Sequence, residues 1–175
     1  MGWDIVYMTE FYNKKTKQWQ PAQDVQLFYT PSADGMTIES CRNVGEYDLL
    51  AGRSTRDYNV FHILSGVRLN NEESSVAVFN TDPKGFPEDV HELTRNVLNC
   101  DAYDDTINYA TLAELETYFE EKKEDIVKYF GSEYTAFLWF INALNKIRIE
   151  LIERMNDDDI LVRKDEFRII YGYNY

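Results

Sequence analysis

The chain has 175 residues, of which 44% are hydrophobic and 15% aromatic, which is too apolar for a disordered protein and favours one domain spanning residues 1–175. Its 18 basic and 31 acidic residues leave a formal net charge of −13. This balance argues against nucleic acid and anionic membranes as direct ligands, and it makes a basic protein the favoured kind of partner.

The N-terminal part of the chain has the character of β-structure. Residues 3–12 are expected to form a strand, and because apolar side chains occupy both of its faces we place it inside a sheet. Residues 13–17 form a polar turn, and Trp19 begins the returning strand. Residues 24–29 are expected as a short edge strand or loop. Residues 36–54 show no clear periodicity and are expected to form a loop that contains short pieces of strand or helix.

The middle of the chain is organised around residues 56–70, where apolar residues recur at helical spacing and Gly66 supplies a stop. Residues 76–79 are expected to form a short strand. Pro87 is expected in the first turn of a further helix, where its missing amide donor costs nothing. An acidic loop over residues 99–109 follows.

The C-terminal part predicts a helical hairpin. Residues 111–114 read Thr-Leu-Ala-Glu, a capping box that starts a helix ending at Gly131. A second helix is expected over residues 132–156, where the apolar spacing continues for about five turns. Residues 165–173 alternate as a strand does and are placed in the sheet of the first strand. The expected fold is α+β, with mixed α/β as the alternative, and consists of one sheet with both terminal strands packed on the helical hairpin.

Negative charge is concentrated in residues 88–125, which contain twelve acidic and three basic residues. One interpretation is that two amphipathic helices turn ordinary acidic faces to water. The other is a surface that imitates the charge of a nucleic acid backbone and attracts a basic cleft. In that interpretation the candidate binding residues are Glu116, Glu120, Glu121, Glu124 and Asp125.

No complete catalytic or metal-binding motif occurs in the sequence, which lacks a P-loop, GxGxxG, GxSxG, EF-hand and HExxH. Cys41 and Cys100 stand far apart, which argues against a cysteine zinc site and a disulfide scaffold. His62 is expected to be a core histidine. The sequence shows neither a signal peptide nor an apolar run of membrane-spanning length. We therefore expect no catalytic residue, no metal, no cofactor and a cytoplasmic location.

Several short segments occur in the same order as in a family of small proteins encoded mostly by bacteriophages and prophages. Residues 1–6 read Met-Gly-Trp-Asp-Ile-Val, and residues 56–68 read Arg-Asp-Tyr-Asn-Val-Phe-His-Ile-Leu-Ser-Gly-Val-Arg. Lys-Gly-Phe-Pro-Glu-Asp-Val follows at 84–90, Tyr-Ala-Thr-Leu-Ala-Glu-Leu at 109–115, and an Arg-containing strand at 167–174. The chain resembles that family, whose members tend to open Met-Gly-Cys-Asp-Ile-His and to carry His-Ser-His-Ser before the Thr-Leu-Ala-Glu-Leu segment.

This chain departs from the family at the histidines, because Val6 replaces the opening one and Asp-Thr-Ile-Asn at 105–108 replaces the later run. If the family has a histidine metal site, this chain has lost those ligands. The positions that it retains are candidates for a shared pocket: Asp4, Arg56, Tyr58, Arg68, Gly85, Pro87 and Asp89.

The resemblance implies a phage-type accessory protein that acts by binding, most concretely an inhibitor of a host defence system such as a CRISPR nuclease. Its partner would be a basic host protein in the cytoplasm of an infected bacterium. Two alternatives stay open. One is a nucleotide-sequestering protein, and the other is a small metal- or nucleotide-dependent hydrolase using Asp4, His62, Asp89 and Asp105.

Overall fold

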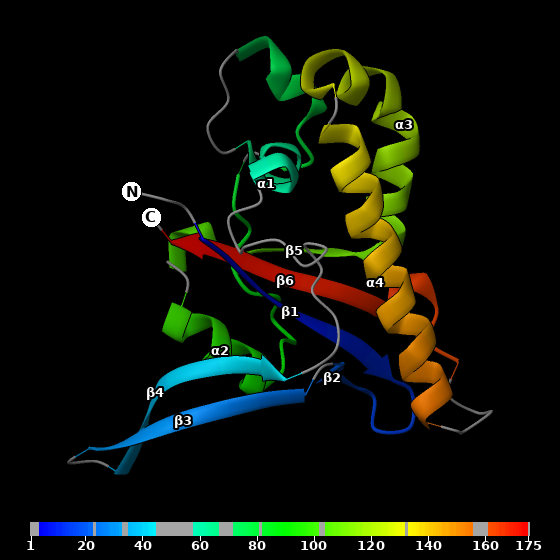
Figure 1. Cartoon of the computed structure of the whole chain (residues 1–175). Coiled ribbons are helices and arrows are strands. Elements are labelled where there is room, and N and C mark those ends of the chain that lie inside the picture. The colour runs from blue at the N-terminus through cyan, green and yellow to red at the C-terminus, as the bar shows by residue number, and fades with distance from the viewer. Residues whose placement is uncertain are drawn as a thin grey trace.

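The fold is α+β, as the sequence predicts (Figure 1). A four-stranded sheet has the strand order β2-β1-β6-β5, and a separate two-stranded sheet is formed by β3 and β4. All strand pairs are antiparallel. The computed structural model describes residues 4–22, 24–32, 35–44, 58–66, 72–80, 82–101, 104–131, 133–155 and 161–174.

The elements are distributed over the whole chain. The strands are β1 (Asp4–Asn13), β2 (Gln18–Pro21), β3 (Asp24–Ser32), β4 (Gly35–Val44), β5 (Asn108–Thr111) and β6 (Phe167–Asn174). The α-helices are α1 (Tyr58–Ser65), α2 (Glu92–Asp101), α3 (Leu112–Phe130) and α4 (Glu133–Met155). Three short 3-10 helices are η1 (Glu72–Ala77), η2 (Asp104–Thr106) and η3 (Lys164–Glu166).

Strands β1 and β6 are the paired inner strands of the four-stranded sheet, which confirms the prediction that the two terminal strands lie in one sheet. In their register Phe11 lies opposite Phe167, and Met8 lies opposite Ile170. Because side chains alternate along a strand, these two pairs point to opposite faces of the sheet. All four are buried, so the sheet is covered on both sides.

The two faces have different covers (Figure 1). Helices α1, α3 and α4 cover the face that carries Phe11 and Phe167, and together they form the larger hydrophobic core. Helix α2 covers the opposite face, where Met8 and Ile170 join a smaller core with Val97. Helix α2 also contacts β4, which brings the two-stranded sheet to this side.

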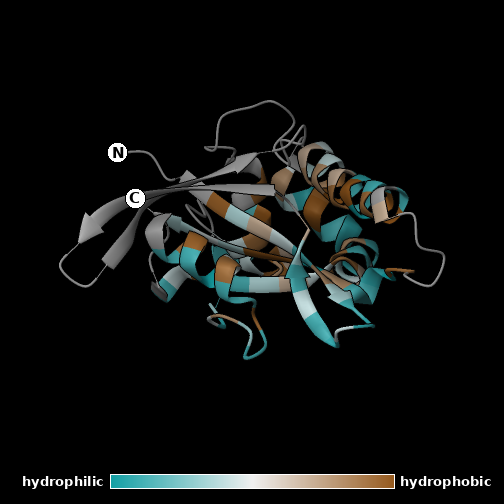
Figure 2. Cartoon of the chain, turned by 90° about the horizontal axis from the view of Figure 1, so that it is seen from below, coloured by the Kyte–Doolittle hydropathy of each residue, from teal (hydrophilic) through white to brown (hydrophobic). Residues whose placement is uncertain are grey.

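The helical hairpin forms where the sequence predicts it. The Thr111 amide donates to the Glu114 carboxylate at 2.7 Å, and the Glu114 amide donates to the Thr111 hydroxyl at 3.1 Å. Gly131 ends α3 with a φ of 53°, a value that favours glycine. The rings of Phe119 and Phe137 lie 6.0 Å apart between the two helices. Figure 2 shows hydrophobic and hydrophilic residues interspersed along both helices, as expected of amphipathic helices.

The structure corrects two predictions in the middle of the chain. Helix α1 ends at Gly66 as predicted, but residues 76–79 do not form a strand, because 72–77 form η1. The amides of Phe79 and Asn80 donate instead to carbonyls of α1, those of Ile63 and Leu64. This segment therefore satisfies the C-terminal carbonyls of a helix, which a strand pattern does not reveal.

Three further boundaries differ from the predictions. The stretch at 36–54 is expected as loop with short pieces of strand or helix, and the structure forms the ten-residue strand β4 up to Val44, paired with β3, while residues 45–54 lie outside the described residues. Helix α2 begins at Glu92 and not at Pro87, because residues 88 and 89 form a turn. The expected loop at 99–109 contains the end of α2, η2 and the start of β5. Within the described residues, no helix combines the length and apolar character needed to cross a membrane.

Candidate functional site

The acidic residues predicted to form one patch lie along α3, on the side turned away from the core. Glu120, Glu121 and Glu124 are exposed, and none has a basic side chain within ion-pair distance among the described residues. Glu116 is half-buried and accepts a hydrogen bond from Lys164 Nζ at 2.8 Å. Asp125 is also half-buried and lies 3.9 Å from a lysine of its own helix. We call the three unpaired carboxylates the acidic face of α3.

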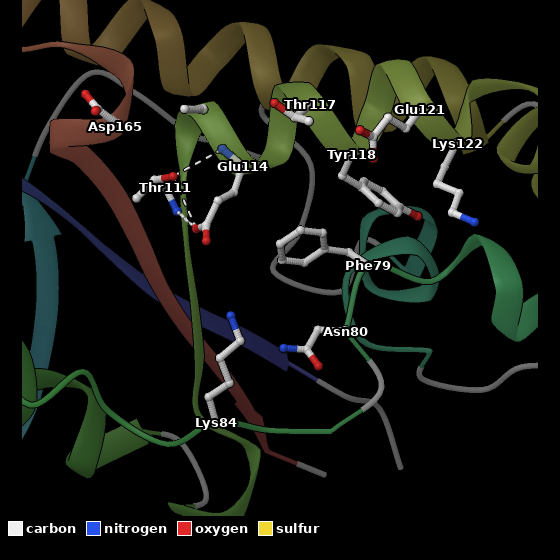
Figure 3. A pocket seen from close by; sticks show the side chains of 11 residues that line it. Phe79, Asn80, Lys84, Thr111, Glu114, Thr117, Tyr118, Glu121, Lys122 and Asp165 are labelled. Carbon is white, nitrogen blue, oxygen red and sulfur yellow. Dashed lines mark hydrogen bonds between the residues drawn. The ribbon is translucent and has the colours of Figure 1, made fainter.

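A groove of about 820 Å³ adjoins the acidic face (Figure 3). It lies between the N-terminal half of α3 and the segment after η1. The rings of Phe79 and Tyr118 form its apolar part, with their centroids 5.1 Å apart in an edge-to-face arrangement. The groove is lined by Phe79, Asn80, Lys84, Thr111, Ala113, Glu114, Thr117, Tyr118, Glu121, Lys122 and Asp165.

The polar groups of the groove are suited to binding. Burial, and to a smaller extent the charge of Asp125, raises the pKa of Tyr118 well above its ordinary value. The Tyr118 hydroxyl therefore stays protonated, and it donates to the carbonyl of Ala77. Lys84 and Glu114 point into the groove from opposite sides (Figure 3). The groove thus presents charges of both signs beside two aromatic rings, although Glu114 also accepts from Thr111 and Lys84 lies over the Tyr109 ring.

A buried ion cluster centred on Arg168 lies on the other face of the sheet. Arg168 Nε and Nη2 donate to Glu10 Oε2 at 2.9 and 2.7 Å, and its Nη1 donates to Asp89 Oδ1 at 2.8 Å. The guanidinium carbon lies 3.9 Å from the centroid of the Trp19 ring. The His91 amide donates to the other Glu10 oxygen at 3.0 Å. The cluster therefore attaches the loop before α2 to the two inner strands.

The two carboxylates of this cluster differ in how far they are buried. The side chain of Glu10 is 0% exposed and that of Arg168 is 5% exposed, whereas that of Asp89 is 63% exposed. A buried charge is tolerated only when it is paired and hydrogen-bonded, because leaving water is costly. Glu10 and Arg168 thus belong to the core, and Asp89 is the part of the cluster that faces solvent. Sequence reasoning found Asp89 alone, although the charge of Arg168 between Phe167 and Ile169 in the C-terminal strand was an available signal.

The structure does not assemble the predicted shared pocket around one place. Asp4 begins β1, where it pairs with Asn174, and Tyr58 begins α1. Helix α1 and Asp89 lie on opposite faces of the sheet. Arg56 and Arg68, two further candidates, lie outside the described residues, whereas Gly85 and Pro87 lie in the loop that leads to Asp89.

The residues named for the hydrolase alternative do not lie in one place either. His62 is half-buried on α1, and its ring stacks on Phe130 with a centroid distance of 6.3 Å. The sheet separates it from Asp89, and Asp105 is exposed on η2. In the part of the chain that the structure describes, no group of three or more His, Cys, Asp or Glu is placed to hold a metal ion.

Two of the three positions at which the resembling family carries histidine hold apolar side chains here, and these belong to the smaller core or pack against it. Val6 packs against the smaller core, which contains Ile107 together with Met8, Leu98 and Ile170. Asp105, at the first position of the later run, is exposed. These positions therefore contribute hydrophobic contact in this chain, and a carboxylate and aliphatic side chains stand in place of imidazoles.

Comparison with known proteins gives a partial match. No family model matches the chain, and no solved structure matches it. A stretch of 63 residues, 36% of the chain, is 36% identical to the C subunit of the aspartyl/glutamyl-tRNA(Asn/Gln) amidotransferase of Hydrogenobaculum sp. (strain Y04AAS1). The match spans 62% of the length of that curated relative.

Proposed function

We propose that this protein acts by binding a basic protein partner through the acidic face of α3. The observation that carries the proposal is that Glu120, Glu121 and Glu124 are exposed and form no ion pair within 4 Å among the described residues, although Lys122 and Lys123 lie on the same helix. Acidic side chains that serve the fold are used differently in this chain, as the pairs of Glu116 with Lys164 and of Glu10 with Arg168 demonstrate. The three free carboxylates leave their charge available to a partner.

The spacing of these charges suits a surface that normally binds nucleic acid. Glu120 and Glu124 are one helical turn apart, which separates them by about 6 Å along the helix axis. A protein that binds nucleic acid presents Lys and Arg side chains to a regular row of phosphates. The acidic face would engage the same side chains and exclude the nucleic acid. Complementary charge of this kind mainly accelerates association and selects the partner.

The resemblance to phage-encoded proteins points to the class of partner. We propose a component of a host defence system, such as a CRISPR nuclease, in the cytoplasm of an infected bacterium. Inhibition would then follow from occupation of a basic cleft and would require no chemistry by this chain.

A second candidate is a role as one component of an enzyme assembly, and the partial match to a tRNA-dependent amidotransferase component supports it. An enzyme that acts on tRNA also needs basic groups for the phosphates. Both candidates therefore predict a basic partner for the same face. Co-expression with the other components of such an amidotransferase, followed by co-purification, distinguishes this candidate from the first.

The decisive experiment compares two charge-reversed variants. The first carries Glu120→Lys, Glu121→Lys and Glu124→Lys on the acidic face. The second carries the same change in charge on exposed acids elsewhere, as Glu72→Lys, Glu88→Lys and Glu153→Lys. Each is expressed in bacteria with an active CRISPR system, and the plating efficiency of a targeted phage is measured.

We expect the wild-type chain and the second variant to raise the plating efficiency, and the first variant to lose this effect. Capture of the nuclease by the immobilised chain should show the same order and weaken as salt rises, because the Debye length is about 8 Å at physiological ionic strength. Equal activity of the two variants would exclude the acidic face as the binding surface. If neither the wild-type chain nor either variant changed the plating efficiency, and none captured the nuclease, the defence system would be excluded as the target.

A further inference from the structure

A second hollow of about 470 Å³ lies beside the Arg168 cluster, between the β1–β2 hairpin and the start of α2. It is separate from the groove on α3, since no residue lines both. The acidic-face proposal does not use it. Its lining consists of Tyr12, Lys17, Gln18, Trp19, Asp89, Val90, His91 and Glu92.

Two aromatic rings form one side of this hollow. Tyr12 and Trp19 are half-buried on paired strands, with ring centroids 5.7 Å apart and planes inclined by 65°. The ring of Trp19 already accepts a cation, because the guanidinium of Arg168 lies 3.9 Å from its centroid. Attraction between a cation and the electron-rich face of an aromatic ring is strongest for Trp. The Trp19 ring is therefore of the type that binds a planar cation, and Arg168 already occupies one of its faces.

Carboxylates also line the hollow. Asp89 uses Oδ1 to accept from Arg168, while its side chain remains 63% exposed. Arg168 carries one positive charge against the two negative charges of Glu10 and Asp89, so the cluster retains an excess of one negative charge. Glu92 is exposed and has no ion-pair partner among the described residues. Two carboxylates therefore face a hollow in which the local charge is not balanced.

One cation of the chain lines the same hollow. Lys17 is exposed and has no carboxylate within 4 Å among the described residues. It occupies the turn between β1 and β2 with a φ of 57°, a conformation rare for a residue other than glycine. Its ammonium group has no fixed partner in that part of the chain, and it would compete with any cation that enters.

We propose that this hollow binds the guanidinium group of an arginine side chain from another molecule. A guanidinium is planar, stacks on aromatic rings and donates parallel hydrogen bonds to carboxylates. The rings of Tyr12 and Trp19 and the carboxylates of Asp89 and Glu92 line the hollow together and offer these two kinds of contact. Lysine, with a compact and strongly hydrated ammonium, satisfies only the carboxylates and binds more weakly.

The fluorescence of Trp19 reports on the hollow directly. The chain contains three tryptophans, so Trp3→Phe and Trp139→Phe leave Trp19 as the single tryptophan emitter. This variant is titrated with N-acetyl-arginine amide, whose capped ends leave the guanidinium as the only charge. N-acetyl-citrulline amide, which has the same shape without the charge, is the matched control, and N-acetyl-lysine amide tests the preference for a planar cation.

We expect a saturable change in Trp19 emission with the arginine amide, a weaker response with the lysine amide and none with the citrulline amide. Glu92→Gln should weaken arginine binding about threefold, the effect of one exposed ion pair, without touching the Arg168 cluster. Asp89→Asn should weaken it further while its amide oxygen still accepts from Arg168. Lys17→Gln should strengthen binding, and Lys15→Gln on the same turn should leave it unchanged.

Several results would overturn the proposal. One is the absence of a saturable response to the arginine amide, and another is an equal response to the citrulline amide. Weaker binding in Lys17→Gln, together with a response to inorganic phosphate, would show that the hollow is an anion site. If free arginine bound far more tightly than the capped amide, the ligand would be a free amino acid and not a protein side chain. Reversal of the acidic face on α3 should leave all of these titrations unchanged, so the two proposals fail independently.

Discussion

The acidic face of α3 and the Arg168 cluster, on opposite sides of the sheet, use acidic residues in opposite ways. On the α3 side, Glu120, Glu121 and Glu124 are exposed and form no ion pair within 4 Å among the described residues. On the α2 side, Glu10 is fully buried and both of its oxygens accept hydrogen bonds, from Arg168 and from the His91 amide. The difference shows that acidic residues of similar type serve the fold where they are buried and remain available for binding where they are exposed.

The largest effect is expected from breaking the buried cluster. Arg168→Met removes the side chain that pairs with Glu10 and leaves a charge in the core, which costs about 3–5 kcal/mol of unfolding free energy. Urea denaturation followed by circular dichroism measures the loss. Adding Glu10→Gln should restore part of the stability because the orphaned charge is removed. A loss below about 1 kcal/mol in Arg168→Met would show that the cluster does not hold the sheet to the loop before α2.

A smaller effect is expected at the start of α3, between the two regions. Thr111→Ala removes the hydroxyl that accepts from the Glu114 amide, and the unfolding free energy of the protein should fall by about 1–2 kcal/mol. Thr111→Ser, which keeps the hydroxyl, is the matched control and should stay close to wild type. If both variants lost the same stability, the methyl group of Thr111 and not its hydrogen bond would be the cause.

The groove next to the acidic face should respond to removal of one hydroxyl. Tyr118→Phe deletes the donor to the Ala77 carbonyl and should cost about 1 kcal/mol at neutral pH. The pKa of Tyr118 is raised in the folded chain, so the wild type loses stability as pH rises above about 10, where the unfolded chain ionises first. The cost of Tyr118→Phe should therefore shrink at alkaline pH. A difference that stays constant from neutral pH to about one unit above the ordinary tyrosine pKa would contradict this account.

The smallest effect on folding is expected from the acidic face itself. Each exposed helix charge contributes about half a kcal/mol or less, so reversing Glu120, Glu121 and Glu124 should leave the unfolding midpoint nearly unchanged. The same variant should slow association with a basic partner, and the wild-type association rate should fall over a tenfold increase in salt. Stopped-flow or surface-based kinetics measures both. An association rate that is independent of salt and of the three reversals would mean that α3 turns only an ordinary hydrated face to solvent.

Much of the fold could be predicted because its signals are local. The capping box at Thr111, the glycine stops at Gly66 and Gly131, and the spacing of apolar residues in α3 and α4 each lie within a few turns. The alternation of residues along the segments likewise predicts the strands β1 and β6. The strand prediction for residues 76–79 is wrong because the donors of Phe79 and Asn80 are satisfied by the end of α1, a contact that a local pattern does not contain.

The candidate sites were predicted less completely for a related reason. The sequence by itself determined that α3 is acidic on the side opposite its apolar stripe, because both patterns follow the period of one helix. Only the tertiary structure decided that Glu10 and Arg168, 158 positions apart, share a buried pair. It also decided that His62 and Asp89 lie on opposite sides of the sheet. Strand pairing and the alternation of side chains determine which residues meet and on which side of the sheet they lie. Both depend on which distant segments of the chain come together.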